Sequence, residues 1–205
     1  MIRVIVRAIL ILAASYLIGG IPFGFIAAKM RGIDITRYGS GVTGATNVLR
    51  VLGPGPAIVV ALLDVSKGVI AVLLAERLTV PPNAAIPVLS GLLAMTGHNF
   101  SPYLRFKGGK GVSVGAGVVL MIMPKVILVA LAVFVVVVAL TRYVSLASIL
   151  GGITAAVTAF AMRQPAPHLV FVTLGALYVL VQHRSNIRRL LTGTESKIGQ
   201  RVKIK

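Results

Sequence analysis

Residues 111–140 read GVSVGAGVVLMIMPKVILVALAVFVVVVAL, with Lys125 as the one charged side chain. An apolar run of this length is either one tilted helix or two short helices. Pro124 and Lys125 stand in its middle, and a proline beside a charge favours a turn at a membrane surface. We therefore predict two helices, over residues 111–123 and 126–141, with a hinge between them.

The composition of the chain places most of it in lipid. Of the 205 residues, 57% are hydrophobic and 12% are charged, and the mean hydropathy is +0.97. A soluble domain of this size has no core large enough to bury that much apolar surface. Cysteine is absent, which excludes disulfides, thiolate nucleophiles and thiolate metal sites.

The charge of the chain is strongly basic, with 21 Lys and Arg residues against 4 Asp and Glu residues. In a soluble protein this excess would suggest nucleic acid binding, but here the cations lie between apolar runs and in the tail. Membrane orientation and anionic substrates explain them better, and we expect no nucleic acid partner because the chain has no soluble basic domain.

Seven apolar runs approach the length of about 20 residues that a helix needs to cross a membrane. The basic start of the chain resembles a signal peptide but lacks a small-residue cleavage site, so we interpret it as part of a retained first span. The predicted spans are residues 8–28, 55–76, 84–98, 111–123, 126–141, 144–162 and 168–183.

Seven spans place the basic segments on one side of the membrane. These segments are the loops 29–54 and 99–110, the turn 141–143 and the tail 184–205, and they hold most of the Lys and Arg residues. Since basic loops stay in the cytoplasm, we predict an all-α integral membrane protein with its N-terminus outside and its C-terminus in the cytoplasm. We expect a single domain over residues 1–205.

A glycine-rich first loop, YGSGVTGATNVLR, covers residues 38–50. Backbone amides freed by glycine, with Ser and Thr hydroxyls and the terminal Arg50, suit an anion-binding nest. The alternative is a flexible connection between helices. It is not a Walker A loop, because no Gly-Lys-Ser/Thr follows at the required spacing.

The second loop, GHNFSPYLRFKGGKG, covers residues 97–111. Lys107 and Lys110 flank two glycines directly before a helix, where backbone and ammonium groups together favour an anion. The alternative is an ordinary positive-inside anchor. An anchor does not require glycines between the lysines, nor a His-Asn pair before them.

The end of the last span reads QHRSNIRR over residues 182–189. His183 and Asn186 are three residues apart, so a helix places them on one face. The alternative for His183 is a helix-end cap. Within the second span, Asp64 and Lys67 are also three apart, and they either pair with each other or leave Lys67 to reach a ligand phosphate. We interpret His168 as an ordinary loop residue.

Together these segments resemble the PlsY family of bacterial membrane acyl-phosphate:glycerol-3-phosphate acyltransferases. The resemblance covers nearly the whole chain, and it departs from the family at Val42-Thr43, where the family usually has Asn-Pro. The motifs that carry it are GSG at 39–41, GATNVLR at 44–50, GHNFSP at 97–102, KGGKG at 107–111, HRSN at 183–186 and GTE at 193–195.

The resemblance implies transfer of a fatty acyl group from acyl phosphate to sn-glycerol 3-phosphate. The products would be lysophosphatidic acid and phosphate, in the first acylation step of phospholipid synthesis at the bacterial cytoplasmic (inner) membrane, with the active site facing the cytoplasm. We expect no metal or other cofactor and a monomer whose partners are the two substrates and the bilayer. The acyl chain would lie between helices in lipid, without a water-filled tunnel.

The resemblance also implies a set of site residues. The catalytic candidates are Ser40, Arg50, Lys110, His183 and Asn186, and the substrate-binding candidates are Gly41, Thr46, Asn47, Lys67, His98, Asn99, Lys107, Gly108, Gly109 and Gly111. The proton acceptor is either His183 or a substrate phosphate oxygen. We place none of the four acidic residues in the site, and we expect Glu195 to pair with Arg188 or Arg189 in the tail.

The alternative function is a small transporter for phosphorylated metabolites, because basic glycine-rich loops also suit an anion gate. A transporter places its ionisable residues near the middle of the membrane. In this chain the three motifs lie at one predicted surface, and only Asp64 and Lys67 lie deep. This distribution favours the enzyme.

Overall fold

The computed structural model describes residues 2–80, 84–200 and 202, and every regular element within them is helical. The helices are α1 (Ile2–Gly20), α2 (Phe23–Lys29), α3 (Ala45–Leu52), α4 (Pro54–Leu78), α5 (Ala85–Asn99), α6 (Val112–Ile122), α7 (Pro124–Thr141), α8 (Val144–Ala161), α9 (Ala166–Gln182) and α10 (Arg184–Leu191). Two short 3₁₀ helices, η1 (Ile35–Arg37) and η2 (Pro102–Leu104), lie in the loops.

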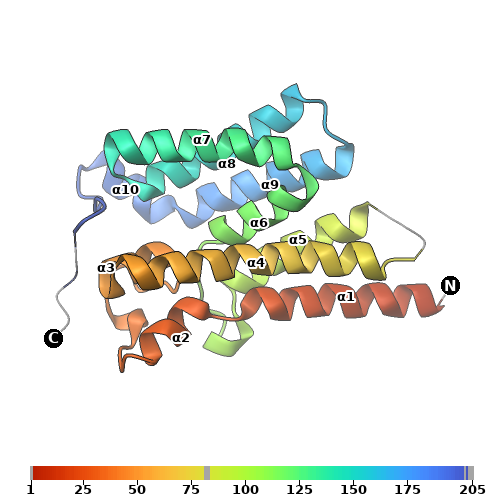
Figure 1. The fold of residues 1–205 in the computed structure, drawn as a ribbon, viewed down its shortest axis with the longest axis horizontal. Helices are drawn as coiled ribbons and strands as arrows, with labels where there is room; N and C mark the ends of the chain where they lie inside the picture. Colours follow the sequence, from red (N-terminus) through yellow and green to blue (C-terminus); the bar gives the residue numbers. More distant parts are fainter. Residues whose placement is uncertain (1, 81–83, 201, 203–205) are drawn as a thin grey trace.

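The long helices run roughly side by side in two groups (Figure 1). In the first group α1 packs against α4 and α5, and in the second α8 packs against α7 and α9. The short helix α6 lies between the groups, with its main contacts on α4. The connections that carry α2, α3 and α10 gather at one end of the bundle, opposite the end where α1 begins.

The predicted hinge in the stretch 111–140 is confirmed. Helix α6 ends at Ile122 and α7 begins at Pro124, while Met123 between them has a non-helical backbone with φ −146° and ψ 65°. A proline at the first position of a helix costs no hydrogen bond, because the first amides have no partner within the helix. The apolar run is therefore two helices.

Four segments are long and apolar enough to cross a membrane, and a fifth joins them if the bent pair α9 and α10 counts as one span. The four are Ile2–Lys29, Pro54–Leu78, Pro124–Thr141 and Val144–Ala161. Helix α5 has 15 residues and α6 has 11, so both are short for a full crossing. The chain is an α-helical membrane protein, and its seven crossings stay a prediction.

Three sequence-based boundaries need correction. The first span begins at Ile2 rather than at residue 8, and it breaks before Phe23, since Pro22 separates α1 from α2. Helix α5 ends at Asn99, one residue beyond the predicted limit of the span at residue 98, so Asn99 is not a loop residue. His168 lies in the first turn of α9, not in a loop.

Glycines allow the close helix contacts that position the motif loops. A Cβ atom on Gly19 would lie 2.1 Å from the Ala94 carbonyl oxygen, and one on Gly117 would lie 2.1 Å from the Val65 carbonyl oxygen. Small residues let helix backbones approach closely in lipid. The second contact holds α6 against α4, which brings the second loop beside the first.

Candidate active site

A polar cavity of about 290 Å³ opens among α3, α4, α6, α8 and the junction of α9 with α10. It gathers segments that are far apart in the chain. Its walls include Ser40, Arg50, Lys110, His183 and Asn186, which are all five predicted catalytic residues, and Thr46, Asn47, His98 and Gly111 from the predicted substrate-binding set. The three motifs thus converge, as the sequence predicts.

Several helices begin at the wall of the polar cavity. The first residues of α3, α6 and α8 line it, and so do His183 and Asn186 at the start of α10. The first amides of a helix lack partners within the helix and carry partial positive charge. With Arg50 and Lys110 beside them, these amides make the cavity suited to phosphate groups.

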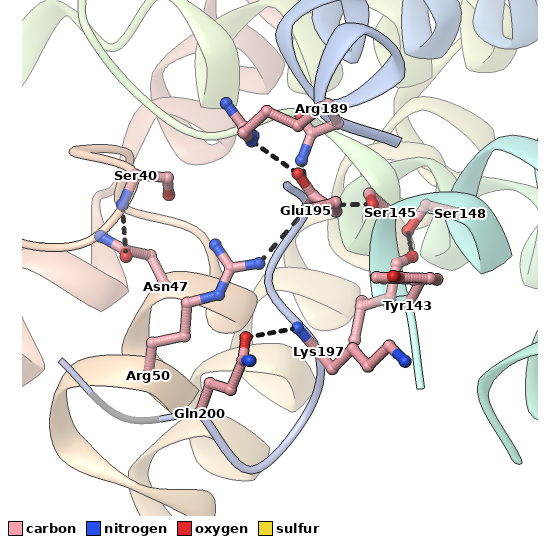
Figure 2. A network of polar contacts seen from close by, with 12 residues as sticks. Ser40, Asn47, Arg50, Tyr143, Ser145, Ser148, Arg189, Glu195, Lys197 and Gln200 are labelled. Carbon is pink, nitrogen blue, oxygen red and sulfur yellow. Dashed lines mark hydrogen bonds and ion pairs between the residues drawn. The ribbon is translucent and has the colours of Figure 1, made fainter. Parts of the chain in front are cut away.

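Asn47 holds the first loop in shape. Its side chain is fully buried and donates hydrogen bonds to the carbonyl oxygens of Tyr38 (3.1 Å) and Val42 (2.9 Å), with a longer contact to that of Ile35 (3.4 Å). Its Oδ1 accepts a hydrogen bond from the Ser40 amide at 3.0 Å (Figure 2). Asn47 therefore positions Ser40 at the cavity.

The glycines of the second loop are required by close contacts with the end of α5. The Gly109 amide donates to the His98 carbonyl oxygen at 3.0 Å, and a Cβ on Gly109 would lie 2.0 Å from His98 Nε2. Gly111 has φ +78°, and a Cβ there would meet Asn99 Oδ1 at 2.8 Å. Larger residues would displace the buried His98 and Asn99, so the loop sequence reflects packing as well as anion binding.

The second and third motifs are joined by a hydrogen bond from the Lys110 ammonium to the Asn186 side-chain oxygen. Burial lowers the pKa of Lys110 to about 8, while the nearby Glu195 carboxylate opposes that effect. Burial also lowers the pKa of Arg50 from its ordinary value. A phosphate group that enters the cavity would stabilise the charged forms of both side chains and offset the free-energy cost of burying them.

The orientation of His183 leaves one ring nitrogen free for a substrate. Its Nδ1 lies 2.8 Å from the Val179 carbonyl oxygen, which only accepts hydrogen bonds, so Nδ1 carries a proton. In the neutral ring Nε2 is then an acceptor. Since His183 is 3% exposed and lines the cavity, its geometry suits a group that takes a proton from a hydroxyl.

Glu195 lies against the wall of the polar cavity: it is not among the described lining residues, but it contacts three that are. Its carboxylate accepts hydrogen bonds from Asn186 Nδ2 (2.7 Å) and Ser145 Oγ (2.9 Å), and it pairs with Arg189 (2.6 Å) (Figure 2). Arg50 Nη2 lies 3.6 Å from it. Burial raises the pKa of Glu195, but these hydrogen bonds outweigh burial and lower it below its ordinary value.

Asp64 lines the polar cavity, which corrects the prediction that no acidic residue belongs to the site. Its Oδ1 lies 2.7 Å from Lys67 Nζ, which confirms the predicted pair. Lys67 further contacts His98 Nδ1 at 3.0 Å and the Ile21 carbonyl oxygen at 2.9 Å. Lys67 therefore positions Asp64 and His98, which line the wall, and is not itself among the described residues of the wall.

Other predicted substrate-binding residues are absent from the described lining of the cavity. Gly108 and Gly109 pack against His98, and Asn99 is buried beneath Gly111. Gly41 has φ +71° and shapes the turn after Ser40. Lys107 is exposed, and Lys110 is the lysine of that loop that reaches the site. The residues in question are Gly41, Lys67, Asn99, Lys107, Gly108 and Gly109.

Three serines of the wall were not among the predicted site residues: Ser113, Ser145 and Ser148. Ser145 and Ser148 are three residues apart in the first two turns of α8, directly after the cationic turn at Arg142. Two hydroxyls on one face at the basic end of a predicted span were the available signal. Ser148 donates its hydroxyl to the Val144 carbonyl oxygen at 2.9 Å, which leaves its lone pairs toward other groups.

An apolar cavity of about 330 Å³ adjoins the polar cavity between α4, α6, α7, α8 and α9. Apolar side chains and glycines form most of its wall. The two cavities share Ala61, Gly111, Val112, Ser113, Phe134 and Ser148. A single ligand with a charged head and an alkyl chain would fit across them.

Thr43 stands where the resembling family usually has proline, and its amide contacts the Gly108 carbonyl oxygen at 3.5 Å. A proline has no amide hydrogen, so this link between the first and second loops depends on the departure from the family pattern. Among the described residues, no group of three or more His, Cys, Asp and Glu side chains is placed to hold a metal ion.

A family model described as glycerol-3-phosphate acyltransferase matches residues 9–193. Curated glycerol-3-phosphate acyltransferases are similar over nearly the full chain. The protein from Desulforamulus reducens is 46% identical over 198 residues (96% of this chain, 98% of that protein). The one from Trichormus variabilis is 43% identical over 208 residues (94% and 92%).

Two crystal structures of PlsY, an integral membrane glycerol 3-phosphate acyltransferase, share the fold. The glycerol 3-phosphate form has a TM-score of 0.89 and 38% identity, and the lysophosphatidic acid form has a TM-score of 0.86 and 37% identity. Each match covers 94% of this chain and 96% of the other.

Proposed function

The chain belongs to the glycerol-3-phosphate acyltransferase (PlsY) family, and on this premise we propose that acyl phosphate is its acyl donor. It moves the fatty acyl group to sn-glycerol 3-phosphate and releases lysophosphatidic acid and phosphate. The observation that carries the proposal is the cationic polar cavity joined to an apolar cavity, because both substrates have phosphate groups and one has an alkyl chain.

The two phosphates share the polar cavity. Arg50, Lys110 and the helix N-termini neutralise their charge, and Ser40 donates a hydrogen bond from its hydroxyl. The acyl chain extends into the apolar cavity past Phe134 and Ser148, which line both spaces. Holding both substrates in one cavity supplies the proximity that the transfer needs.

In the reaction a glycerol hydroxyl oxygen attacks the acyl carbonyl carbon. The bond between that carbon and the phosphate oxygen breaks, and phosphate leaves with the electron pair. The hydroxyl proton passes to Nε2 of His183 or to a phosphate oxygen of a substrate. Asn186 and Lys110 donate toward the negative charge that develops on the carbonyl oxygen. Acyl phosphate is already activated, so no covalent enzyme intermediate is needed.

The proposal includes the membrane arrangement. One domain crosses the bacterial inner membrane seven times, with the N-terminus outside and the polar cavity at the cytoplasmic face, and the protein acts as a monomer without a metal or other cofactor. Supporting this arrangement, the connections that carry α2, α3 and α10 lie at one end of the bundle (Figure 1), and Arg50, Lys110 and Asn186 from the three motifs line one cavity. Family membership favours the acyltransferase over the alternative of a transporter.

The test is an assay of the purified protein in detergent with palmitoyl phosphate and glycerol 3-phosphate, with a chelator present and without coenzyme A. We expect lysophosphatidic acid and phosphate in equal amounts. Palmitoyl coenzyme A replaces palmitoyl phosphate in the control reaction. Activity with the thioester alone would overturn the donor assignment, and no product from either donor would overturn the proposed function.

A further inference from the structure

The chain after α10 folds back over the active-site end of the bundle. We call residues 195–200 the strap. Its start is held by Glu195, which accepts a hydrogen bond from Ser145. In its middle, the Ile198 amide donates to the Arg142 carbonyl oxygen (2.9 Å), and Arg142 Nη2 donates to the Ile198 carbonyl oxygen (2.6 Å). Beyond the strap, the Val202 amide contacts the Arg50 carbonyl oxygen at 3.2 Å. The family match ends at Gly193, before the strap begins.

A third cavity of about 340 Å³ lies between the strap and α3. It shares Thr46, Leu49, Arg50, Pro54 and Val144 with the polar cavity, so the two adjoin at Arg50. Of the described residues that line this strap cavity, Arg50 and Lys197 are cationic and none is acidic. Figure 2 shows Gln200 and the backbone of Lys197 on the strap, with the Lys197 side chain directed toward Tyr143.

The strap cavity and the apolar cavity share no residue, whereas each shares several with the polar cavity. The polar cavity thus has two neighbours, one lined mainly by apolar residues and glycines and one with Arg50 and Lys197 in a mixed lining. An alkyl chain fits the apolar neighbour, and the two cations that line the strap cavity favour an anion there. We propose that the strap cavity is the entry site for the water-soluble phosphate monoester, and that Lys197 attracts it toward Arg50.

This inference rests on the proposed function and names the route by which one substrate of that site arrives. Lys197 is exposed, with its ammonium 5.3 Å from the centre of the Tyr143 ring. Its backbone amide donates to Gln200 Oε1 at 2.9 Å, which fixes the local turn independently of the lysine charge. A change of charge at this side chain therefore alters attraction without dismantling the strap.

The absence of cysteine from the chain allows the charge at one position to be set chemically. Lys197→Cys is purified as the full chain in lipid nanodiscs. It is then modified with aminoethyl methanethiosulfonate, which restores a cation, or with sulfonatoethyl methanethiosulfonate, which adds an anion. Lys29→Cys, at an exposed position at the end of α2, receives the same reagents as the matched control.

We expect the anionic adduct at position 197 to raise the KM for glycerol 3-phosphate about threefold to tenfold relative to the cationic adduct at low salt. High salt should shrink the difference. The KM for palmitoyl phosphate should be equal for the two adducts, because that substrate arrives from the lipid. Both Lys29→Cys adducts should retain the unmodified KM values.

Equal KM values for glycerol 3-phosphate in the two adducts of Lys197→Cys would overturn the inference, and so would an equal rise in the KM of both substrates. An effect of the same size at position 29 would also overturn it, because the attraction would then belong to the whole surface. These results come from an active enzyme and leave the proposed function standing. Absence of lysophosphatidic acid from the unmodified chain would overturn both.

Discussion

Arg50 Nη2 lies 3.6 Å from Glu195 Oε1, so the first motif and the tail meet in an ion pair whose carboxylate is 1% exposed. The same carboxylate accepts from Asn186 and Ser145 and pairs with Arg189. This one carboxylate therefore joins four segments of the chain: α3, α8, α10 and the tail. Removing its charge would leave several cations close together in a partly buried site.

The first prediction concerns this carboxylate. Glu195→Gln removes the charge and keeps the size, and we expect the free energy of unfolding to fall by about 3 kcal/mol, with a large loss of turnover. Thermal unfolding in detergent measures the first effect and product formation the second. Arg188→Gln, at an exposed neighbouring position, is the control and should change neither. An unaltered thermal midpoint in Glu195→Gln would show that these ion pairs contribute nothing to the free energy of unfolding.

The second prediction concerns pH. Burial lowers the pKa of Lys110 to about 8 from an ordinary 10.5, so the free enzyme loses this cation as the pH rises through 8. We expect kcat/KM for glycerol 3-phosphate to fall above that pH, while the fall in kcat lies higher because bound phosphate stabilises the charged form. Lys110→Arg, which stays charged, should move the fall in kcat/KM to higher pH. If its pH profile is identical to that of the unmodified enzyme, the fall belongs to the titration of another group.

The stability of the fold should have the opposite pH dependence. Between pH 8 and 10.5 the unfolded chain keeps a proton on Lys110 that the folded chain has lost. The free energy of unfolding therefore receives a contribution that rises with pH in this window. Across this window the thermal midpoint of the unmodified chain should rise relative to that of Lys110→Met, which has no proton to lose at this position. Parallel curves would contradict the lowered pKa.

The third prediction tests the proton acceptor. With Nδ1 of His183 donating to Val179, Nε2 is the free acceptor in the cavity, and His183→Ala should lower kcat by about 10²- to 10⁴-fold. His168→Ala removes a histidine from the opposite end of α9 and should keep turnover within about twofold. Nearly full turnover in His183→Ala, with an unchanged pH profile, would leave a substrate phosphate oxygen as the acceptor.

The fourth prediction concerns the glycine loop. A Cβ on Gly109 would lie 2.0 Å from His98 Nε2, so Gly109→Ala must displace a buried imidazole that Lys67 also contacts. We expect kcat/KM to fall at least about tenfold, which corresponds to about 1.4 kcal/mol of lost transition-state stabilisation. Gly55→Ala, in a helix position with nothing near its added Cβ, is the control. Equal activity of both variants would refute the packing argument.

The fifth prediction concerns the buried pair on α4. Lys67→Met leaves the Asp64 carboxylate without its 2.7 Å partner, and we expect a loss of about 3–5 kcal/mol in the free energy of unfolding. Adding Asp64→Asn removes the unpaired charge and should recover part of the loss. Thermal unfolding of the two single variants and the double variant measures the coupling. Additive losses would mean that the pair makes no net contribution.

Much of the fold could be predicted because hydropathy and proline position are local properties. The hinge before Pro124 and most helix limits follow from runs of apolar residues and the residues that end them. The five catalytic candidates came from motif resemblance, and the structure places all of them on one cavity. The errors at residue 8 and at Asn99 concern helix ends, where local signals are weakest.

The sequence by itself determined a helical membrane protein with three cationic motifs, because the amount of apolar side chain and the spacing of charges require no knowledge of contacts. Only the tertiary structure decided that Asp64 and the serines of α8 line the site, that Glu195 contacts its wall, and that Lys107 stays outside. It also decided that two further cavities adjoin the polar one. Those outcomes depend on which distant segments pack together, and helix packing and burial set them. Neither is a property of any one stretch of the chain.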